Sequence, residues 1–323
     1  MTATLDPTER CWTPPRRIAA LGEPLLELQP ADAAEIRLAL GGDVANSMVC
    51  LARILGKSRP ELSLVTALGS SGYSAWLRAR LEREGLRLTE APIEGEPGIY
   101  GLPVDAAHGA GFSYWRRQSA ARQFLRSATL AQFDELLGDA QLLLVTGITL
   151  ALCSAESFEH LCRWVELHGD ECRVVFDCNF RRRLWESDTE ARERIGTFER
   201  LASAIATGAD DEKSLWGAAS TPEIIERVSH LSAEYLIRGG PVGCWVGSGR
   251  ECEHVPAEPV TVADTAGAGD AHFAGYLAAR ISGFRRAEAA TYANRAAAVI
   301  VSQRGSAPKQ STSFPPLPTR APR

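Results

Sequence analysis

Two glycines and a carboxylate at the start of an apolar segment are the residues in this sequence best suited to chemistry. The run DTAGAGD at residues 264–270 follows a strand-like stretch at 258–262 and opens an Ala-rich helical pattern. Its glycines allow the backbone N–H groups of Gly267, Ala268 and Gly269 to turn toward one point. A helix N-terminus adds partial positive charge there, so we expect an anion to bind at this junction.

Asp270 lies in the first turn of the expected helix, beside the anion. A carboxylate at this position could cap the helix, which is the usual role of an isolated aspartate in a first turn. It could also accept the proton of a hydroxyl group that attacks a phosphoryl group.

A second glycine pair, Gly41-Gly42, precedes an apolar helical pattern and is followed by Asp43 and Asn46. The glycines allow a ligand to approach the backbone closely. An N-cap would account for one of the two polar residues but not for both together with the glycines. Contact with a ligand is therefore slightly favoured.

Polar residues also follow two apolar runs, at 141–147 and 173–177, that are typical of central parallel strands. Asn179 and Arg181 come directly after the second run, where open α/β sheets bind ligands, and they suit a carboxylate or a phosphate. Asp177 could merely cap the next helix.

Three adjacent acids and a glycine turn come later in the chain. The acids at 210–212 start a helix, where acids usually interact with the helix dipole, but one of them could help to hold a hydrated Mg²⁺. The turn at 238–243 could bring a nucleotide close to the backbone or could be a plain hairpin.

Two short strand-like segments, 97–104 and 111–117, stand apart from this alternation. Because side chains alternate between the two faces of a strand, Tyr114 and Arg116 are expected on the same face. They suit a small sheet that covers an active site and excludes water, or, equally, an exposed pair of edge strands.

The elements that must position these residues alternate between strand and helix, which predicts an α/β fold with a doubly wound, mostly parallel sheet. We expect a flexible lead-in at 1–15, one domain at 16–304 and a flexible Pro-rich tail at 305–323. Segments near 24–40 and 90–118 would form the lid.

The composition is that of an ordinary soluble globular protein, with 45% hydrophobic and 23% charged residues in a chain of 323. A net charge of −5 does not suggest general affinity for nucleic acid. The eight cysteines lack zinc-ligand spacing, and neither a signal peptide nor a membrane-spanning run is visible. We therefore expect a cytoplasmic protein with free thiols and with neither nucleic acid nor membrane as partner.

The run at 264–270, with Phe273-Ala274-Gly275, resembles the C-terminal signature of the ribokinase-like (PfkB) carbohydrate kinases. The similarity extends from about Ile18 to Gly305. Segments 41–46, 97–100, 114–121 and 177–185 most resemble those family members that phosphorylate 2-keto-3-deoxygluconate. The resemblance implies a ribokinase-like fold, ATP and Mg²⁺ as cofactors, a monovalent cation such as K⁺ as a further one, and transfer of phosphate to the 6-hydroxyl of that sugar acid.

The resemblance also implies a role for each candidate residue. Asp270 would be the general base, with an anion hole formed by Gly267, Ala268 and Gly269. The sugar acid would contact Gly42, Asp43, Asn46, Tyr100, Tyr114, Arg116 and Arg181. ATP would lie along Asn179, Arg181, Arg238, Gly240, Gly243, Gly267, Gly269 and Asn294. A hydrated Mg²⁺ would be held through water by Glu212.

The sequence departs from the family pattern at three places: Ala266 replaces Thr, Cys178 replaces Pro, and His272-Phe273 replaces Phe-Asn. We expect His272 to be a packing or surface residue. These changes bear on substrate detail more than on kinase chemistry.

Three alternatives remain: a kinase for a neutral sugar such as fructose or ribose, a catalytically silent sugar sensor of the same fold, and a nucleotide-dependent dehydrogenase. The last is disfavoured because no G-x-G-x-x-G follows the first strand. Exposed edges of the lid strands predict a homo-oligomer.

Overall fold

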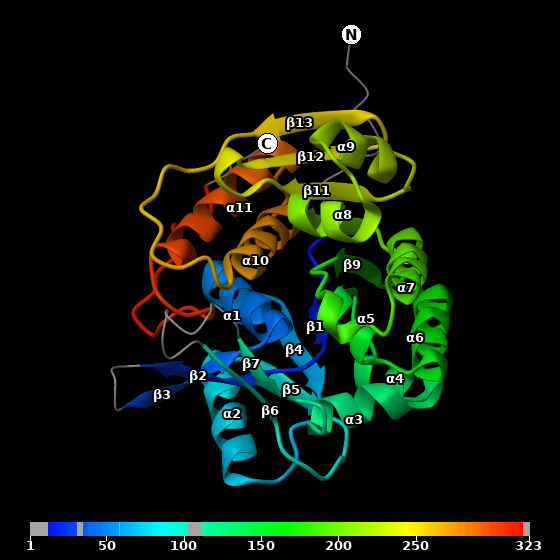
Figure 1. The fold of residues 1–323 in the computed structure, drawn as a ribbon, viewed down its shortest axis with the longest axis vertical. Coiled ribbons are helices and arrows are strands. Elements are labelled where there is room, and N and C mark those ends of the chain that lie inside the picture. The colour runs from blue at the N-terminus through cyan, green and yellow to red at the C-terminus, as the bar shows by residue number, and fades with distance from the viewer. Residues whose placement is uncertain (1–11, 31–34, 58, 103–111, 319–323) are drawn as a thin grey trace.

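The computed structural model describes residues 12–30, 35–57, 59–102 and 112–318. A sheet of nine strands crosses the molecule (Figure 1). The strand order is β13-β12-β11-β10-β9-β8-β1-β4-β5, and all neighbours are parallel except at the β11, β12, β13 edge. A separate four-stranded sheet has the order β3-β2-β6-β7. The predicted doubly wound, mostly parallel sheet with a small second sheet is confirmed.

The strands are β1 (Arg17–Leu21), β2 (Leu25–Pro30), β3 (Ile36–Gly41), β4 (Glu61–Thr66), β5 (Arg87–Glu90), β6 (Gly98–Gly101), β7 (Ser113–Trp115), β8 (Leu142–Thr146), β9 (Arg173–Asp177), β10 (Ala204–Gly208), β11 (Glu234–Arg238), β12 (Cys244–Ser248) and β13 (Glu251–Val255). The helices are α1 (Asp43–Leu55), α2 (Gly72–Arg83), α3 (Ala120–Ser127), α4 (Leu130–Leu137), α5 (Gly147–Leu152), α6 (Ala155–His168), α7 (Asp188–Leu201), α8 (Ala209–Trp216), α9 (Thr221–Ser229), α10 (Ala268–Ile281) and α11 (Arg286–Val301), with short 3₁₀ helices η3 (Arg182–Leu184) and η4 (Gly240–Val242).

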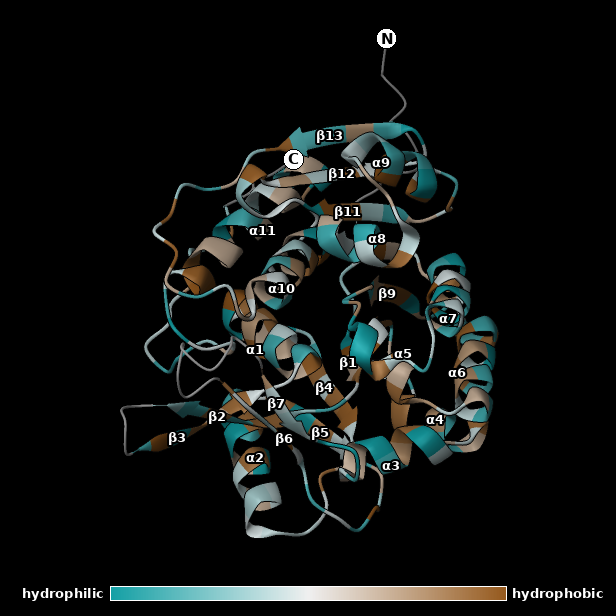
Figure 2. Ribbon diagram, in the orientation of Figure 1, coloured by the Kyte–Doolittle hydropathy of each residue, from teal (hydrophilic) through white to brown (hydrophobic). Residues whose placement is uncertain are grey.

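Both faces of the central strands of the large sheet are buried, which explains why strands such as β8 and β9 read as continuous apolar runs. Along β1, Ile18 and Ala20 belong to one hydrophobic core, whereas Ala19 and Leu21 belong to the core on the other face. In Figure 2 the inner strands β4 and β9 are largely brown, while teal marks polar turns of α6 and α7.

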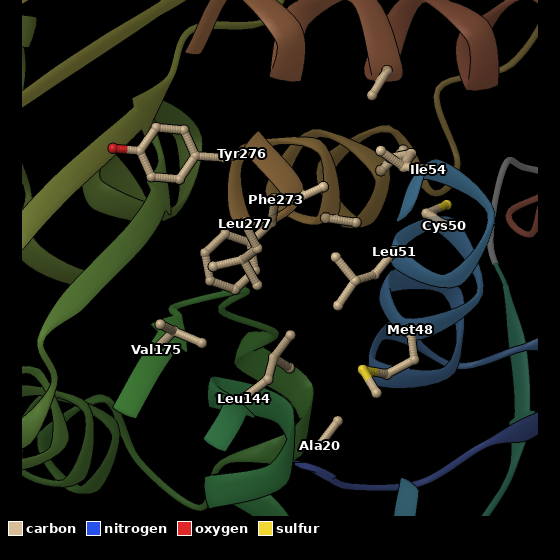
Figure 3. Close-up of a cluster of buried hydrophobic side chains, with 14 of the residues drawn as sticks. Ala20, Met48, Cys50, Leu51, Ile54, Leu144, Val175, Phe273, Tyr276 and Leu277 are labelled. Atoms are coloured by element: carbon tan, nitrogen blue, oxygen red, sulfur yellow. The ribbon is translucent and has the colours of Figure 1, made fainter. Parts of the chain in front are cut away.

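Packing of α1 against α10 fixes the start of α10, which carries the glycine run. Met48 and Leu51 of α1 and Phe273 and Leu277 of α10 share one buried cluster with Leu144 of β8 (Figure 3). Because this cluster anchors both helices on the sheet, their N-termini are held at a fixed separation.

Two segments differ from the sequence-based expectation near the ends of the chain. Trp12 is buried, with the guanidinium carbon of Arg280 5.3 Å from the centre of its ring, so packing begins within the expected lead-in; residues 1–11 lie outside the described residues. Phe314 and Leu317 pack against the core. The described part of the expected tail is therefore packed onto the domain.

The prediction of a strand at 258–262 is wrong. This stretch is irregular, and the strand in this region is β13, which ends at Val255. Pro256 and Pro259 lack the N–H group that a ladder needs, so pairing stops there. Val260 and Val262 are consequently exposed.

All seven cysteines within the described residues are unpaired thiols. In that same part of the chain, no helix has both the length and the apolar character needed to cross a bilayer.

Candidate active site

A cavity of about 1360 Å³ opens at the carboxyl ends of β9, β10 and β11. That is the edge at which open α/β sheets bind ligands. Strand β6 and the residues next to it from the small sheet also line the cavity. Of the predicted site residues, the cavity is lined by Gly42, Asp43, Asn46, Tyr100, Tyr114, Arg116, Asn179, Arg181, Arg238, Gly240, Gly243, Gly267, Ala268, Gly269, Asp270 and Asn294.

Helix α10 starts at the predicted glycine run, but Ala268 N, which was expected in the anion hole, donates to Thr265 O at 3.3 Å. Gly267 is the N-cap, and the first helical hydrogen bond runs from Ala271 N to Gly267 O at 3.0 Å. The N–H groups of Gly269 and Asp270 come before that bond, so the helix itself gives them no acceptor. Together with the helix dipole, they can receive a negatively charged group from the cavity.

The loop before α10 is held in shape by one carboxylate. Asp264 accepts hydrogen bonds from Ala266 N and from Gly305 N, each at 3.0 Å. Gly267 adopts φ 75°, and a Cβ atom on it would lie 1.9 Å from the carbonyl oxygen of Ser306. Only glycine fits there, because both the left-handed backbone and the neighbouring chain exclude a side chain.

Asp270 is partly buried and lines the cavity, where Asn46 Nδ2 donates a hydrogen bond to its Oδ2 at 2.9 Å. Burial, with the nearby charges of Asp43 and Asp177, raises its pKa to about 7, although Asn46 and Arg181 favour the ionised form. A carboxylate whose pKa lies near neutrality is suited to accept a proton and release it again.

We predict that kcat/KM falls as the pH drops below about 7. Asp270 is then protonated in the free enzyme and cannot accept the hydroxyl proton. Above that pH the carboxylate is ionised, so titration of Asp270 should no longer change kcat/KM. Steady-state rates from pH 5.5 to 9 test this, and a flat profile down to pH 5.5 would contradict it.

Asn179 connects the end of β9 to the start of α1. Its Nδ2 donates to Asp43 Oδ2 at 3.1 Å, and its backbone has φ 32°, in the left-handed region that asparagine tolerates better than most residues. Asn179, which was predicted to contact the nucleotide, thus also orients the carboxylate of Asp43, which was predicted to contact the sugar.

Arg238 supports the anion site from β11. Its guanidinium makes a bidentate ion pair with Asp177 at 2.7 and 2.6 Å and donates to Gly269 O at 3.3 Å. The sequence left Asp177 as a possible helix cap, and its actual partner lies 61 residues away, beyond the reach of a local pattern.

Asn294, which was predicted to lie along ATP, is hydrogen-bonded to neighbouring groups of the chain. Its Nδ2 donates to the carbonyl oxygens of Val255 and Pro256 at 3.2 and 2.8 Å, and its Oδ1 lies 3.0 Å from His272 Nε2. Burial lowers the pKa of His272 to about 3, so this ring is neutral and donates to Asn294. His272 is buried, and it also lines the cavity.

A buried network that the sequence did not indicate holds Tyr100. The Tyr100 hydroxyl and the Ser306 hydroxyl both donate to Glu27, and they lie 2.7 Å apart. Glu27 lies on β2 and Tyr100 on β6, whereas Ser306 follows α11 and touches Gly267 through its backbone. The small sheet is thereby connected to the anion site.

Replacing Ser306 with alanine removes two hydrogen bonds of this network. We expect the KM for the sugar to rise by about three- to tenfold, because a buried hydrogen bond to a charged group contributes about 1.5–3 kcal/mol and Tyr100 retains Glu27. Steady-state kinetics measure this, with Ser302→Ala as control, since the exposed Ser302 hydroxyl donates to Val299 O away from this network. An unchanged KM would contradict the role of the network.

The arginines predicted to bind the sugar acid both have carboxylate partners. Arg116 and Glu23 are buried and form an ion pair. Arg181, which is about half exposed, lies 3.8 Å from Asp211 and donates to Phe180 O at 3.0 Å. Both line the cavity, and their contact with a sugar acid stays a prediction.

The Mg²⁺ role predicted for Glu212 is wrong. This carboxylate is fully buried and accepts hydrogen bonds from Thr207 at 2.9 Å and from Arg227 at 2.7 and 2.5 Å. It faces the packing between α8 and α9 and is not among the residues that line the cavity. At a helix start, an acid can turn inward to neutralise a buried arginine.

The fold is that of a known family of small-molecule kinases. Residues 18–313 match the pfkB family carbohydrate kinases, and the chain belongs to that family. It is 31% identical over 298 residues to 2-dehydro-3-deoxygluconokinase of Escherichia coli K12, covering 90% of this chain and 96% of that one. It is thus a sugar kinase, as predicted. The name 2-dehydro-3-deoxygluconate, used for the substrate of that relative, is another name for 2-keto-3-deoxygluconate.

Kinases of a neutral sugar are also similar. A fructokinase of Klebsiella pneumoniae is 27% identical over 270 residues, covering 81% of this chain and 83% of that one. A solved fructokinase of Vibrio cholerae, bound to fructose, ADP and potassium ion, superposes with a TM-score of 0.77 at 20% identity, covering 92% and 94% of the two chains.

Proposed function

We propose that this kinase transfers the γ-phosphoryl group of ATP to the 6-hydroxyl of 2-keto-3-deoxygluconate. The observation that carries the proposal is the partly buried Asp270, with a pKa of about 7, beside the N–H groups that open α10. The relatives named 2-dehydro-3-deoxygluconokinase support this substrate.

Asp270 accepts the proton of the 6-hydroxyl as its oxygen forms a bond to the γ-phosphorus. The bond between that phosphorus and the β–γ bridging oxygen breaks, and ADP leaves with the electron pair. The N–H groups of Gly269 and Asp270 stabilise the negative charge on the transferring group. Asn46 orients the carboxylate through its hydrogen bond to Oδ2.

ATP fits the remaining part of the cavity. Gly240 and Gly243 have no side chains there, and both adopt positive φ, 62° and 98°. The exposed side chains of Val260 and Val262 line the same region and offer apolar contact to a flat base. A glycine turn opposite apolar side chains is suited to a nucleotide whose phosphates point toward α10.

Mg²⁺ would neutralise phosphate charge, with Asp211 as the acid that holds its water. Asp211 lines the cavity, and burial raises the pKa of its carboxyl. The described residues contain no group of three or more metal-ligating side chains, as suits an ion bound mainly by phosphate and water. The solved fructokinase with potassium ion supports K⁺ as a further proposed cofactor.

A coupled assay for ADP with a sugar panel tests the function. We expect kcat/KM for 2-keto-3-deoxygluconate to exceed that for fructose and ribose by at least about tenfold, as a site built for a charged group should. A higher value for a neutral ketose would assign the chain to the other kinases of this fold. Calorimetric binding of sugar without any turnover of ATP would favour the silent sensor.

We propose in addition that the small sheet joins two copies of the chain in a cytoplasmic homo-oligomer. Its outer strands, β3 and β7, expose Ile36 and Trp115 by 60% and 59%. An unpaired edge with apolar side chains favours association. Light scattering after size exclusion gives the mass, and a monomer at micromolar concentration would contradict the proposal.

A further inference from the structure

A second cavity, of about 460 Å³, lies at the C-terminal ends of α1 and α2, away from the active site. Polar side chains predominate in its lining, and Phe314 is the one apolar member. The cavity is lined by Arg53, Arg80, Arg83, Glu84, Gln310, Thr312, Ser313 and Phe314, none of which lines the first cavity. Because polar groups in a cavity need hydrogen-bonding partners, this lining suits a polar ligand.

The lining of this second cavity carries three guanidinium groups and one carboxylate, that of Glu84. The carboxylate is already engaged, since Arg53 donates to its two oxygens at 2.8 and 2.7 Å and Arg80 forms an ion pair with it. Within the described part of the chain, Arg83 has no carboxylate at ion-pair distance, and its Nε donates to Ala79 O at 3.1 Å. An excess of positive charge therefore remains, which favours an anion.

Basic residues in the last turn of a helix often serve only to satisfy its terminal carbonyl groups. At these two helix ends, another arginine does so. Arg59 donates to Ala52 O of α1 at 2.9 Å and to Glu84 O, at the C-cap of α2, at 2.8 Å. The exposed Arg83 is thus left with N–H groups that can bind a ligand.

The other wall of the second cavity belongs to the segment that follows α11. Thr312 Oγ1 donates to Gln303 Oε1 at 2.6 Å, so this hydrogen bond closes a loop of the chain. The loop contains Gly305 and Ser306, whose backbones border the glycine run at the start of α10. A ligand that connects α2 to this loop would therefore stabilise a segment on which the active site depends.

We propose that the second cavity binds a phosphate group, either as free phosphate or as the phosphate monoester of a sugar, and that the bound anion stabilises residues 303–314. The guanidinium of Arg83 presents parallel N–H donors that match two phosphate oxygens. The Ser313 hydroxyl and the Gln310 amide, in the same lining, can donate to further oxygens. The inference does not depend on which sugar the enzyme phosphorylates.

Calorimetric titration with inorganic phosphate tests the site, after Mg²⁺ and a non-hydrolysable ATP analogue have filled the phosphate positions of the active site. We expect Arg83→Gln to weaken phosphate binding by about tenfold or more, as loss of a charged hydrogen bond should, and Arg83→Lys to weaken it less. Arg163→Gln, which removes the same charge from an exposed residue of α6, should leave it unchanged. Equal binding by Arg83→Gln and the wild type, or no binding by the wild type at millimolar phosphate, would overturn the proposal.

A parallel titration with glucose 6-phosphate distinguishes the two sources of the phosphate group. Tighter binding than that of inorganic phosphate assigns the site to a sugar phosphate, and equal or weaker binding assigns it to free phosphate. Hydrogen exchange tests the effect on the chain: the amides of residues 303–314 should exchange more slowly when phosphate is bound to the wild type, but not in Arg83→Gln. Unchanged exchange in the phosphate-bound wild type would contradict the stabilisation of this segment.

Discussion

Replacing Asp270 with asparagine is expected to lower kcat by about 10²–10⁴-fold, the usual contribution of a general base. Asparagine keeps the shape of the side chain but cannot accept the hydroxyl proton. The hydrogen bond that Asn46 Nδ2 donates to Oδ2 can be retained by the new amide oxygen. Binding of ATP and sugar, measured by calorimetry, should therefore change little.

The same substitution is expected to raise Tm. Asp270 has a higher pKa in the folded protein than in the unfolded chain, because burial and the charges of Asp43 and Asp177 oppose its ionisation. The folded state therefore loses stability as the pH rises from the unfolded pKa, about 4, through 7. The gain from asparagine should be largest above pH 7 and should disappear near pH 4, which thermal unfolding at several pH values measures.

Asp210→Asn is the control for this variant. Asp210 also lines the cavity, and the substitution removes one negative charge, but this residue is outside the surroundings of Asp270 described above. We expect its kcat to stay within about threefold of the wild type. Near wild-type turnover in Asp270→Asn would reject the general-base role.

Replacing Gly267 with alanine should have the second large effect, a loss of kcat/KM of about 10²-fold or more, comparable to loss of one oxyanion-hole donor. The new Cβ would lie 1.9 Å from Ser306 O, and the backbone at φ 75° is unfavourable for alanine. The loop must move, so the N–H groups of Gly269 and Asp270 would no longer converge on the phosphoryl group.

Gly269→Ala is the matched variant two residues further on. A Cβ there would meet Arg238 Nη1 at 3.5 Å, an ordinary contact, and this position is not in the left-handed region. We expect it to retain considerably more activity than Gly267→Ala. Circular dichroism should verify that both variants fold, and equal activities would show that the backbone at Gly267 is not what shapes the anion site.

The sequence was sufficient to predict those features that depend on the local conformation of the backbone. Continuous apolar runs predicted the parallel strands because both faces of the sheet are buried. The glycine run before Asp270 predicted where α10 begins, and Gly267 is its N-cap in the left-handed region. Conversely, the prediction of a strand at 258–262 relied on its apolar residues and gave too little importance to the prolines, which prevent strand pairing.

The side chains that support the site were harder to predict, since their partners are distant in the chain. Glu27 and Ser306 are separated by 279 residues, and no local pattern connects them. Glu212 was assigned to the wrong role because its sequence neighbours are acidic, whereas Arg227, its actual partner, lies 15 residues away on α9.

The contact between Ser306 and Gly267 also has a consequence for biosynthesis. The site combines Gly42 and Asp43, which leave the ribosome early, with Gly305 and Ser306, which come after α11. A nascent chain that stops before these residues lacks the backbone that bounds Gly267 and the donor that holds Asp264. Prematurely terminated polypeptides should thus be unable to consume ATP, even where most of the sheet has already folded.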